Sequence, residues 1–144
     1  MAKSPTVLYV EDEESDALFM QRAFAGAGDG LCLGLVTDGR AAIDYLAGAN
    51  SYANREEYPV PAVVLLDLNL PDVHGFEVLR WMRSRPEYAA TPVVIFSSSS
   101  KEEDKVKARE LGANEFVEKP NSGLKFGTVV EALQDWLLGK RHRS

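Results

Sequence analysis

The sequence is short of several residue types that mark particular classes of protein. Its 144 residues include one cysteine, Cys32, so no disulfide can close within the chain and a reducing compartment is expected. The longest runs of aliphatic and aromatic residues are far too short to cross a membrane. Residues 1–6 also lack the apolar stretch of a signal peptide. These absences favour a cytoplasmic protein with no membrane partner.

An excess of positive charge is missing as well. The formal net charge is −6, and the basic run is confined to Lys140, Arg141, His142 and Arg143. Proteins that bind duplex DNA usually present a basic face, because the neutralisation of phosphates supplies most of their affinity. We therefore expect no nucleic-acid partner. We interpret residues 139–144 as a short solvated tail rather than a recognition arm.

The chain does contain the balance of residues found in one soluble globular domain, with 45% hydrophobic and 26% charged residues. Five short apolar runs alternate with segments of helical character. The runs are Val7–Val10, Leu31–Val36, Val63–Leu66, Val93–Phe96 and Phe116–Val117. Continuous apolar runs are typical of strands that helices bury on both faces, and the alternation indicates a parallel sheet. We expect one α/β domain over 1–144, with its core at about 6–138.

Capping residues predict where helices begin. The assignments are Asp38 before a helix at about 39–48, Asp72 before one at about 73–84, and a capping box of Ser100 and Glu103 before one at about 101–111. The last of these helices is mostly charged and has little apolar surface, so we expect it to be weakly anchored.

Apolar periodicity predicts the final helix, which Asn121 or Ser122 would cap and Gly139 would end. Its apolar stripe is Phe126, Val129, Val130, Leu133, Trp136 and Leu137. The long connection at 49–61 contains Pro59 and Pro61, which argue against a helix or a central strand there. This segment is either a tethered surface loop or an element that docks a partner.

Polar residues follow four of the five apolar runs. Glu11 and Asp12 follow the first, Asp67 the third and Ser97 the fourth, and Lys119 lies just past the fifth. The ends of parallel strands meet at one edge of the sheet, so we expect these side chains to converge there. Crowded carboxylates raise one another's pKa, and a divalent cation relieves the repulsion. All-oxygen ligands favour Mg²⁺, or Mn²⁺ in its place.

A metal, carboxylates, a hydroxyl and an ammonium group together suit phosphoryl transfer. One carboxylate attacks as the nucleophile, while the cations neutralise phosphoryl oxygens and Ser97 donates a hydrogen bond to one of them. Each residue alone has an ordinary explanation: a solvated acidic loop, turn chemistry at Asp67, a helix cap at Ser97, or an exposed Lys119. Placement at four strand ends together is poorly explained by coincidence.

At these positions the sequence resembles the receiver domains of two-component response regulators, over residues of about 6–138. The matching motifs are Val10-Glu11-Asp12, Leu66-Asp67-Leu68-Asn69-Leu70-Pro71 with Gly75, Phe96-Ser97-Ser98 and Lys119-Pro120. The resemblance implies a flavodoxin-like (βα)5 three-layer sandwich, with a five-stranded parallel sheet in the order 2-1-3-4-5. It also implies a phosphorelay phosphoprotein that carries an aspartyl phosphate and is not an enzyme, apart from its own phosphotransfer and autodephosphorylation.

The resemblance assigns a role to each residue of the motifs. Asp67 is the phospho-acceptor, and the Mg²⁺ ligands are Asp12, Asp67, Glu11 through water, and the backbone carbonyl of Asn69. The switch pair is Ser97 and Phe116, where serine replaces the more frequent threonine and phenylalanine lacks a phenolic hydroxyl. Lys119 pairs with the phosphoryl group, and its bond to Pro120 is implied to be cis.

The resemblance also implies the partners. The phosphodonor is a histidine kinase. The long 49–61 connection and the Leu-Asn-Leu-Pro motif resemble those of the stand-alone response regulators that are partnered with bacterial phytochromes. Because no output domain follows the receiver, we expect a phosphorylation-dependent surface change. That change is either the formation of a homodimer or the binding of another protein by a monomer.

Two other functions share parts of this pattern. A haloacid-dehalogenase-like phosphatase also uses a nucleophilic aspartate after a strand, but it needs a second aspartate where this chain has Asn69. A flavodoxin-like ligand-binding module would need a phosphate-cradling loop after the first strand, where the acidic residues 11–14 stand instead.

Overall fold

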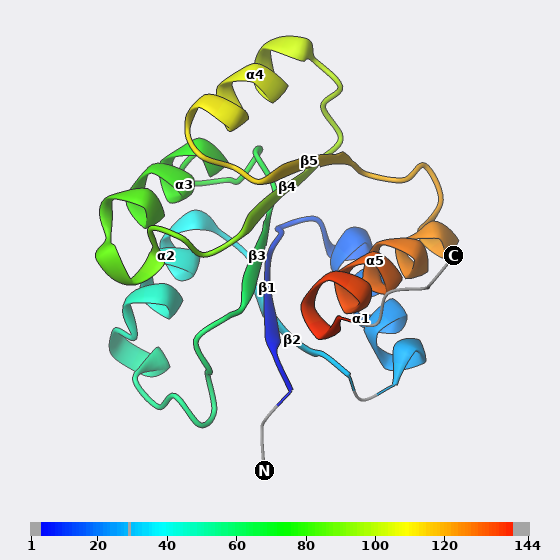
Figure 1. The fold of residues 1–144 in the computed structure, drawn as a ribbon, viewed down its shortest axis with the longest axis horizontal. Helices are drawn as coiled ribbons and strands as arrows, with labels where there is room; N and C mark the ends of the chain where they lie inside the picture. The colour runs from blue at the N-terminus through cyan, green and yellow to red at the C-terminus, as the bar shows by residue number, and fades with distance from the viewer. Residues whose placement is uncertain (1–3, 29, 140–144) are drawn as a thin grey trace.

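In the computed structural model, which describes residues 4–28 and 30–139, a parallel sheet lies between two layers of helices (Figure 1). The five strands are β1 (Thr6–Val10), β2 (Cys32–Val36), β3 (Val63–Leu66), β4 (Val93–Ser97) and β5 (Glu115–Glu118). Their order is β2-β1-β3-β4-β5, and every neighbouring pair is parallel. The predicted flavodoxin-like α/β fold and its strand order are therefore confirmed.

Helices connect the strands and cover both faces of the sheet (Figure 1). They are α1 (Glu14–Ala27), α2 (Gly39–Ala47), α3 (Gly75–Ser84), α4 (Glu102–Glu110) and α5 (Phe126–Leu138), with short 3-10 helices at η1 (Asn50–Tyr52), η2 (Pro86–Tyr88) and η3 (Gly123–Lys125). Figure 1 shows α1 and α5 on one face and α2, α3 and α4 toward the other. No helix in these described ranges is both long and apolar enough to span a bilayer.

Two apolar cores explain why the strands read as continuous apolar runs. Successive strand residues point to opposite faces, so Leu8 packs in the core beneath α2 and α3 while Val7 packs in the core beneath α1 and α5. The same division places Leu66 in the first core and Leu65 in the second, and all four of these side chains are 0% exposed. Because both faces are covered, successive positions inside these strands are apolar on both sides of the sheet.

The cap at Asp38 is confirmed, because its carboxylate accepts a hydrogen bond from the Ala41 amide at 2.7 Å. The cap at Asp72 was assigned to the wrong helix. Helix α3 begins at Gly75 with His74 as its N-cap. The Asp72 carboxylate instead accepts from the amides of Gly39 and Arg40, both at 2.8 Å, at the start of α2. A single helix N-terminus thus receives two carboxylates, which its free amides favour.

The capping box predicted for α4 is also wrong. Helix α4 begins at Glu102, and its N-cap Lys101 makes no side-chain cap. Ser99 takes this part instead, because its hydroxyl donates to Asp104 at 2.7 Å and accepts from the Lys101 amide at 3.2 Å. The predicted weak anchorage agrees with the burial, since Ala108 is the one residue of α4 that is buried.

Helix α5 ends as predicted at Gly139, which adopts a left-handed conformation with φ 68°. Phe126, Val130 and Leu133 of the predicted stripe are buried, but Trp136 is 40% exposed. Ser122 accepts from the Leu124 amide at 3.3 Å and so begins η3, the short turn that leads into α5. The basic run of residues 140–143 lies outside the described residues.

The connection between α2 and β3 is a tethered loop that contains η1. Arg55 donates from Nη1 to the carbonyl of Tyr45 at 2.8 Å and of Tyr58 at 3.1 Å, and from Nη2 to the carbonyl of Leu46 at 2.9 Å. The ring of Tyr52 packs against those of Tyr45 and Tyr58, with centroids 5.2 and 5.0 Å apart. Arg55 therefore satisfies the last carbonyls of α2 and fixes the loop to the domain.

Candidate functional site

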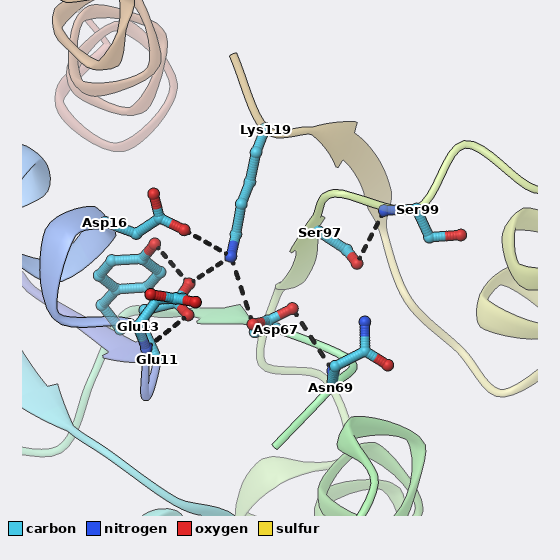
Figure 2. Close-up of polar contacts among 9 residues, drawn as sticks. Glu11, Glu13, Asp16, Asp67, Asn69, Ser97, Ser99 and Lys119 are labelled. Atoms are coloured by element: carbon cyan, nitrogen blue, oxygen red, sulfur yellow. Dashed lines mark hydrogen bonds and ion pairs between the residues drawn. The ribbon is translucent and has the colours of Figure 1, made fainter. Parts of the chain in front are cut away.

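The predicted site residues lie together at the carboxyl edge of the sheet (Figure 2). Glu11 directly follows β1, Asp67 follows β3, Ser97 ends β4 and Lys119 follows β5. The sheet ladder holds their backbones, since the Asp67 amide donates to the Val10 carbonyl at 3.2 Å and the Lys119 amide donates to the Ser97 carbonyl at 2.8 Å. The topology thus brings residues from more than half the chain to one place.

The three carboxylates meet as the sequence predicts. One oxygen from each of Glu11, Asp12 and Asp67 lies within 4.8 Å of the others. Glu11 and Asp67 are buried, whereas Asp12 is exposed and opens the group to solvent. An all-oxygen set with an open side fits a hard divalent cation that keeps water ligands. Asn69 lines the same hollow of about 420 Å³, beside Asp12 and Asp67.

Lys119 reaches down from the end of β5 into this group (Figure 2). Its ammonium lies 2.8 Å from Glu11, 2.9 Å from Asp16 and 3.3 Å from Asp67. Burial alone would lower the pKa of Lys119, but the hydrogen bonds that it donates to Glu11 and Asp16 and the charge of Asp67 raise this pKa above its ordinary value. The side chain is therefore a permanent cation beside the Asp67 carboxylate.

Glu11 is fully buried and held by three donors. Burial raises its pKa to about 7, against the opposing effect of Lys119. The Tyr9 hydroxyl donates to its Oε1 at 2.8 Å, and the Glu13 amide donates to its Oε2 at 3.1 Å. Burial first, and the Glu11 charge second, raise the pKa of Tyr9, so its hydroxyl remains a donor. These contacts fix the orientation of the Glu11 carboxylate.

Asp67 is held by its backbone more tightly than by its carboxylate. Its Oδ1 accepts from the Asn69 amide at a long 3.4 Å, and its Oδ2 contacts Lys119 at 3.3 Å. Gly75, at the start of α3, lies so close that a β-carbon there would be 2.3 Å from the Asp67 carbonyl oxygen. The loosely bonded carboxylate of Asp67 therefore sits on a rigid support, which suits a nucleophile.

Ser97 is buried at the end of β4, and its hydroxyl accepts from the Ser99 amide at 3.2 Å (Figure 2). The neighbouring Ser98 also lines the hollow. Phe116 is half-buried and packs against the core beneath α2 and α3, beside the hollow between α4 and β5. Both residues of the predicted switch pair thus lie near α4, Phe116 through this hollow and Ser97 through Ser99, which bonds to Asp104 of that helix.

Two residues of the site were not predicted. Asp16 lies in the first turn of α1, where an acidic residue is ordinarily explained by the helix dipole. Tyr9 lies inside β1 and reads as a core residue. No pattern in the sequence distinguishes their contacts with Lys119 and Glu11 from these ordinary roles. The resemblance implies a cis bond between Lys119 and Pro120, and this expectation is wrong. The bond is trans, as are all peptide bonds in the described ranges.

Known proteins resemble this chain along most of its length. The sequence profile of the response regulator receiver domain matches residues 7–131. A probable methanogenesis regulatory protein of Methanothrix harundinacea, FilR2, is 34% identical over 92% of this chain and 83% of its own. The phosphorylated cyanobacterial phytochrome response regulator RcpA is 30% identical, with a TM-score of 0.86 over 96% and 97% of the two chains. A response regulator in red light signaling of R. palustris is 32% identical, with a TM-score of 0.86 over 96% of each chain.

Proposed function

The chain belongs to the family of response regulator receiver domains, and we propose that Asp67 is the residue on which it accepts a phosphoryl group from a histidine kinase. The observation that carries this assignment is the position of the Asp67 carboxylate. It is buried, loosely bonded and 3.3 Å from the ammonium of Lys119, with Glu11 and Asp12 alongside. No other carboxylate at this edge of the described structure combines these features.

In the transfer, a carboxylate oxygen of Asp67 attacks the phosphorus atom of the phosphohistidine. A P–O bond forms as the P–N bond breaks, and the imidazole leaves with its electron pair and takes up a proton. Lys119 offers its positive charge to the phosphoryl oxygens, which lowers the energy of the charge that develops there. The same residues serve hydrolysis of the acyl phosphate, so the intrinsic activity is phosphotransfer and autodephosphorylation.

A divalent cation completes this chemistry. Glu11, Asp12, Asp67 and the backbone carbonyl of Asn69 would hold Mg²⁺, or Mn²⁺ in its place, and the bound ion would neutralise phosphoryl oxygens. The oxygen-only donor set supports this choice of metal. We expect Asp12→Asn to weaken Mg²⁺ affinity, as measured by calorimetry, without unfolding the protein. Unchanged affinity in this variant would contradict the ligand role.

The acceptor is tested with acetyl phosphate and Mg²⁺. We expect one acid-stable, base-labile phosphoryl group per chain in the mass spectrum, and none in Asp67→Asn. Asp12→Asn is the matched control, because it removes a neighbouring carboxylate and retains the nucleophile. That variant should still be labelled on Asp67 at a higher Mg²⁺ concentration. Full labelling of Asp67→Asn would refute the assignment.

We propose that the phosphoryl group then draws the Ser97 hydroxyl away from the Ser99 amide. Phe116 moves inward to fill the space, and the surface near α4 changes. Lys119 couples the two events, since it contacts Asp67 and follows β5 directly. Lys119→Ala should therefore accept phosphate but fail to shift the Trp136 fluorescence that reports the change. A full fluorescence change in this variant would count against the coupling.

The similarity to regulators of phytochrome and red-light signalling supports a bacteriophytochrome histidine kinase as the partner of this single receiver in the cytoplasm. Phosphotransfer profiling against the histidine kinases of the same genome tests this partnership.

A phosphorylation-dependent homodimer through α4, β5 and α5 is a second proposal. The apolar hollow between β5 and α5, lined by Val117, Val129 and Trp136, supports it. Sedimentation with and without beryllofluoride decides between the dimer and a monomeric switch.

A further inference from the structure

Lys119 is shared among three carboxylates, and two of them hold it toward β1 and α1. Its ammonium is 2.8 Å from Glu11 and 2.9 Å from Asp16, but 3.3 Å from Asp67 (Figure 2). A lysine has three N–H donors, so these partners engage all of them. The cation that should serve a phosphoryl group on Asp67 is therefore held more closely by two other carboxylates than by the acceptor itself.

The three contacts differ in how easily they can be exchanged. The Glu11 carboxylate is 0% exposed, and loss of its cation would leave a buried, unpaired charge at a large cost. The Asp67 contact passes to the phosphoryl oxygens when Asp67 is phosphorylated. Asp16 has the most exposed side chain of the three, at 22%, so water can take over its contact with Lys119. Asp16 is thus the partner that can give way to a phosphoryl group.

We propose that Asp16 is a positioning residue that competes with the phosphoryl group for Lys119, and so weakens the hold of the site on a phosphorylated Asp67. This inference rests on the proposed function, because it concerns the same lysine and the same acceptor. When a phosphoryl group is present, Lys119 divides its charge between the phosphoryl oxygens and Asp16. When Asp16 is neutral, Lys119 keeps its pair with Glu11 but no longer shares its charge with Asp16, so it interacts more strongly with the phosphoryl oxygens.

Beryllofluoride, which mimics the phosphoryl group, provides an equilibrium test at saturating Mg²⁺. Beryllium is titrated into the protein in excess fluoride, and ¹⁹F NMR reports the bound fraction and the surroundings of the fluorine atoms. We expect Asp16→Asn to bind beryllofluoride at least about fivefold more tightly than the wild type, the lower limit for typical couplings between sites. The bound ¹⁹F signals should also shift, because Lys119 approaches the fluorine atoms. Asp16→Glu keeps the carboxylate and should bind as the wild type does.

Glu13→Gln is the matched control for charge alone. Glu13 lines the same hollow, but Lys119 pairs with Glu11, Asp16 and Asp67 among the described residues, not with Glu13. We expect a smaller gain in affinity from Glu13→Gln than from Asp16→Asn. In a Lys119→Gln background this difference should vanish, because no shared cation is left.

Several results would overturn the inference. Equal gains from Asp16→Asn and Glu13→Gln would mean that only distant charge matters. A difference that persists without Lys119 would place the effect elsewhere. A loss of Mg²⁺ affinity in Asp16→Asn as large as that in Asp12→Asn would make Asp16 a metal ligand instead. In each of these cases the wild type still binds beryllofluoride, whereas a wild type that binds none would refute the proposed function itself.

Discussion

Replacement of Tyr9 by phenylalanine tests how the buried Glu11 carboxylate is held. Tyr9 is 0% exposed, and its ring packs against Phe96 with centroids 5.9 Å apart, a contact that phenylalanine keeps. The substitution therefore removes one hydrogen bond, the 2.8 Å contact with Glu11 Oε1, and leaves the packing intact. A hydrogen bond to a charged group contributes about 2 kcal/mol to stability, and one between neutral groups about 1 kcal/mol. The cost of Tyr9→Phe should accordingly depend on the charge of Glu11.

The pKa of Glu11, raised by burial to about 7, sets the pH range of this effect. Because the folded-state pKa lies above the ordinary value of 4.5, the native state holds this proton more readily than the unfolded chain does. Glu11 thus contributes stability that is fully present below about pH 4.5 and is lost as the pH rises through about 7. Tyr9→Phe removes a bond that favours the charged carboxylate, so the loss with rising pH becomes larger in the variant.

The assay is urea denaturation in metal-free buffer at about pH 5 and about pH 8.5, on either side of the Glu11 pKa of about 7. We expect Tyr9→Phe to cost about 1 kcal/mol at the lower pH and about 2 kcal/mol at the higher one. Tyr88→Phe is the control, because the buried Tyr88 hydroxyl donates to a neutral acceptor, the Leu46 carbonyl, at 2.5 Å. Its cost should be the same at both pH values. An equal cost of Tyr9→Phe at both pH values would refute the role assigned to the Glu11 charge.

Three further substitutions test the supports of the fold, each by the free energy of unfolding in urea. Arg55→Met should cost about 2 kcal/mol, because it removes the hydrogen bonds that join the carbonyls at the end of α2 to the connection before β3, and Arg55→Lys should recover only part of this. Asp72→Ala should cost about 1 kcal/mol and should destabilise α2, since Asp72 accepts from the Gly39 amide; an effect confined to α3 would contradict the observed cap. Gly75→Ala should cost about 3 kcal/mol or more, because its β-carbon would collide with the Asp67 carbonyl, and a near-neutral result would show that α3 can retreat.

The sheet was predictable because its strands coincide with local apolar runs. The residues that carry the chemistry were predictable because they stand at the ends of those strands. The run Val63–Leu66 coincides with β3, and the polar residues after the strands converge as parallel topology requires. Capping was predicted less well, because Asp72 bonds across a gap in sequence that only the packed fold closes, and because α4 begins at Glu102, which leaves the local hydrogen bonds to Ser99 rather than to Ser100. In the first case the fold carries the carboxylate to a helix that begins 33 residues earlier in the chain.

Asp16 and Tyr9 mark the limit of prediction for the site. Each has an ordinary explanation within its own element, and each gains its role from a side chain that another element supplies. Asp16 meets a lysine 103 residues away in sequence, so no spacing within α1 indicates the pair. Residues that carry the chemistry stand at strand ends, where the parallel topology of the sheet predicts their position. Residues that orient them can stand anywhere in the fold.

The position of Lys119 also has a mechanical consequence. Strand β5 lies at the edge of the sheet, and its four residues are exposed or half-buried, so apolar packing fastens it weakly. The lysine that follows it is tied by ion pairs to the end of β1, to α1 and to the end of β3. The ion pairs of the site therefore help to attach this edge strand to the rest of the domain. A change in the charges of the site alters these ion pairs and so acts on β5 directly. Because Lys119 follows β5 in the chain, no intermediate residues are needed to transmit the change to this strand, which lies beside α4.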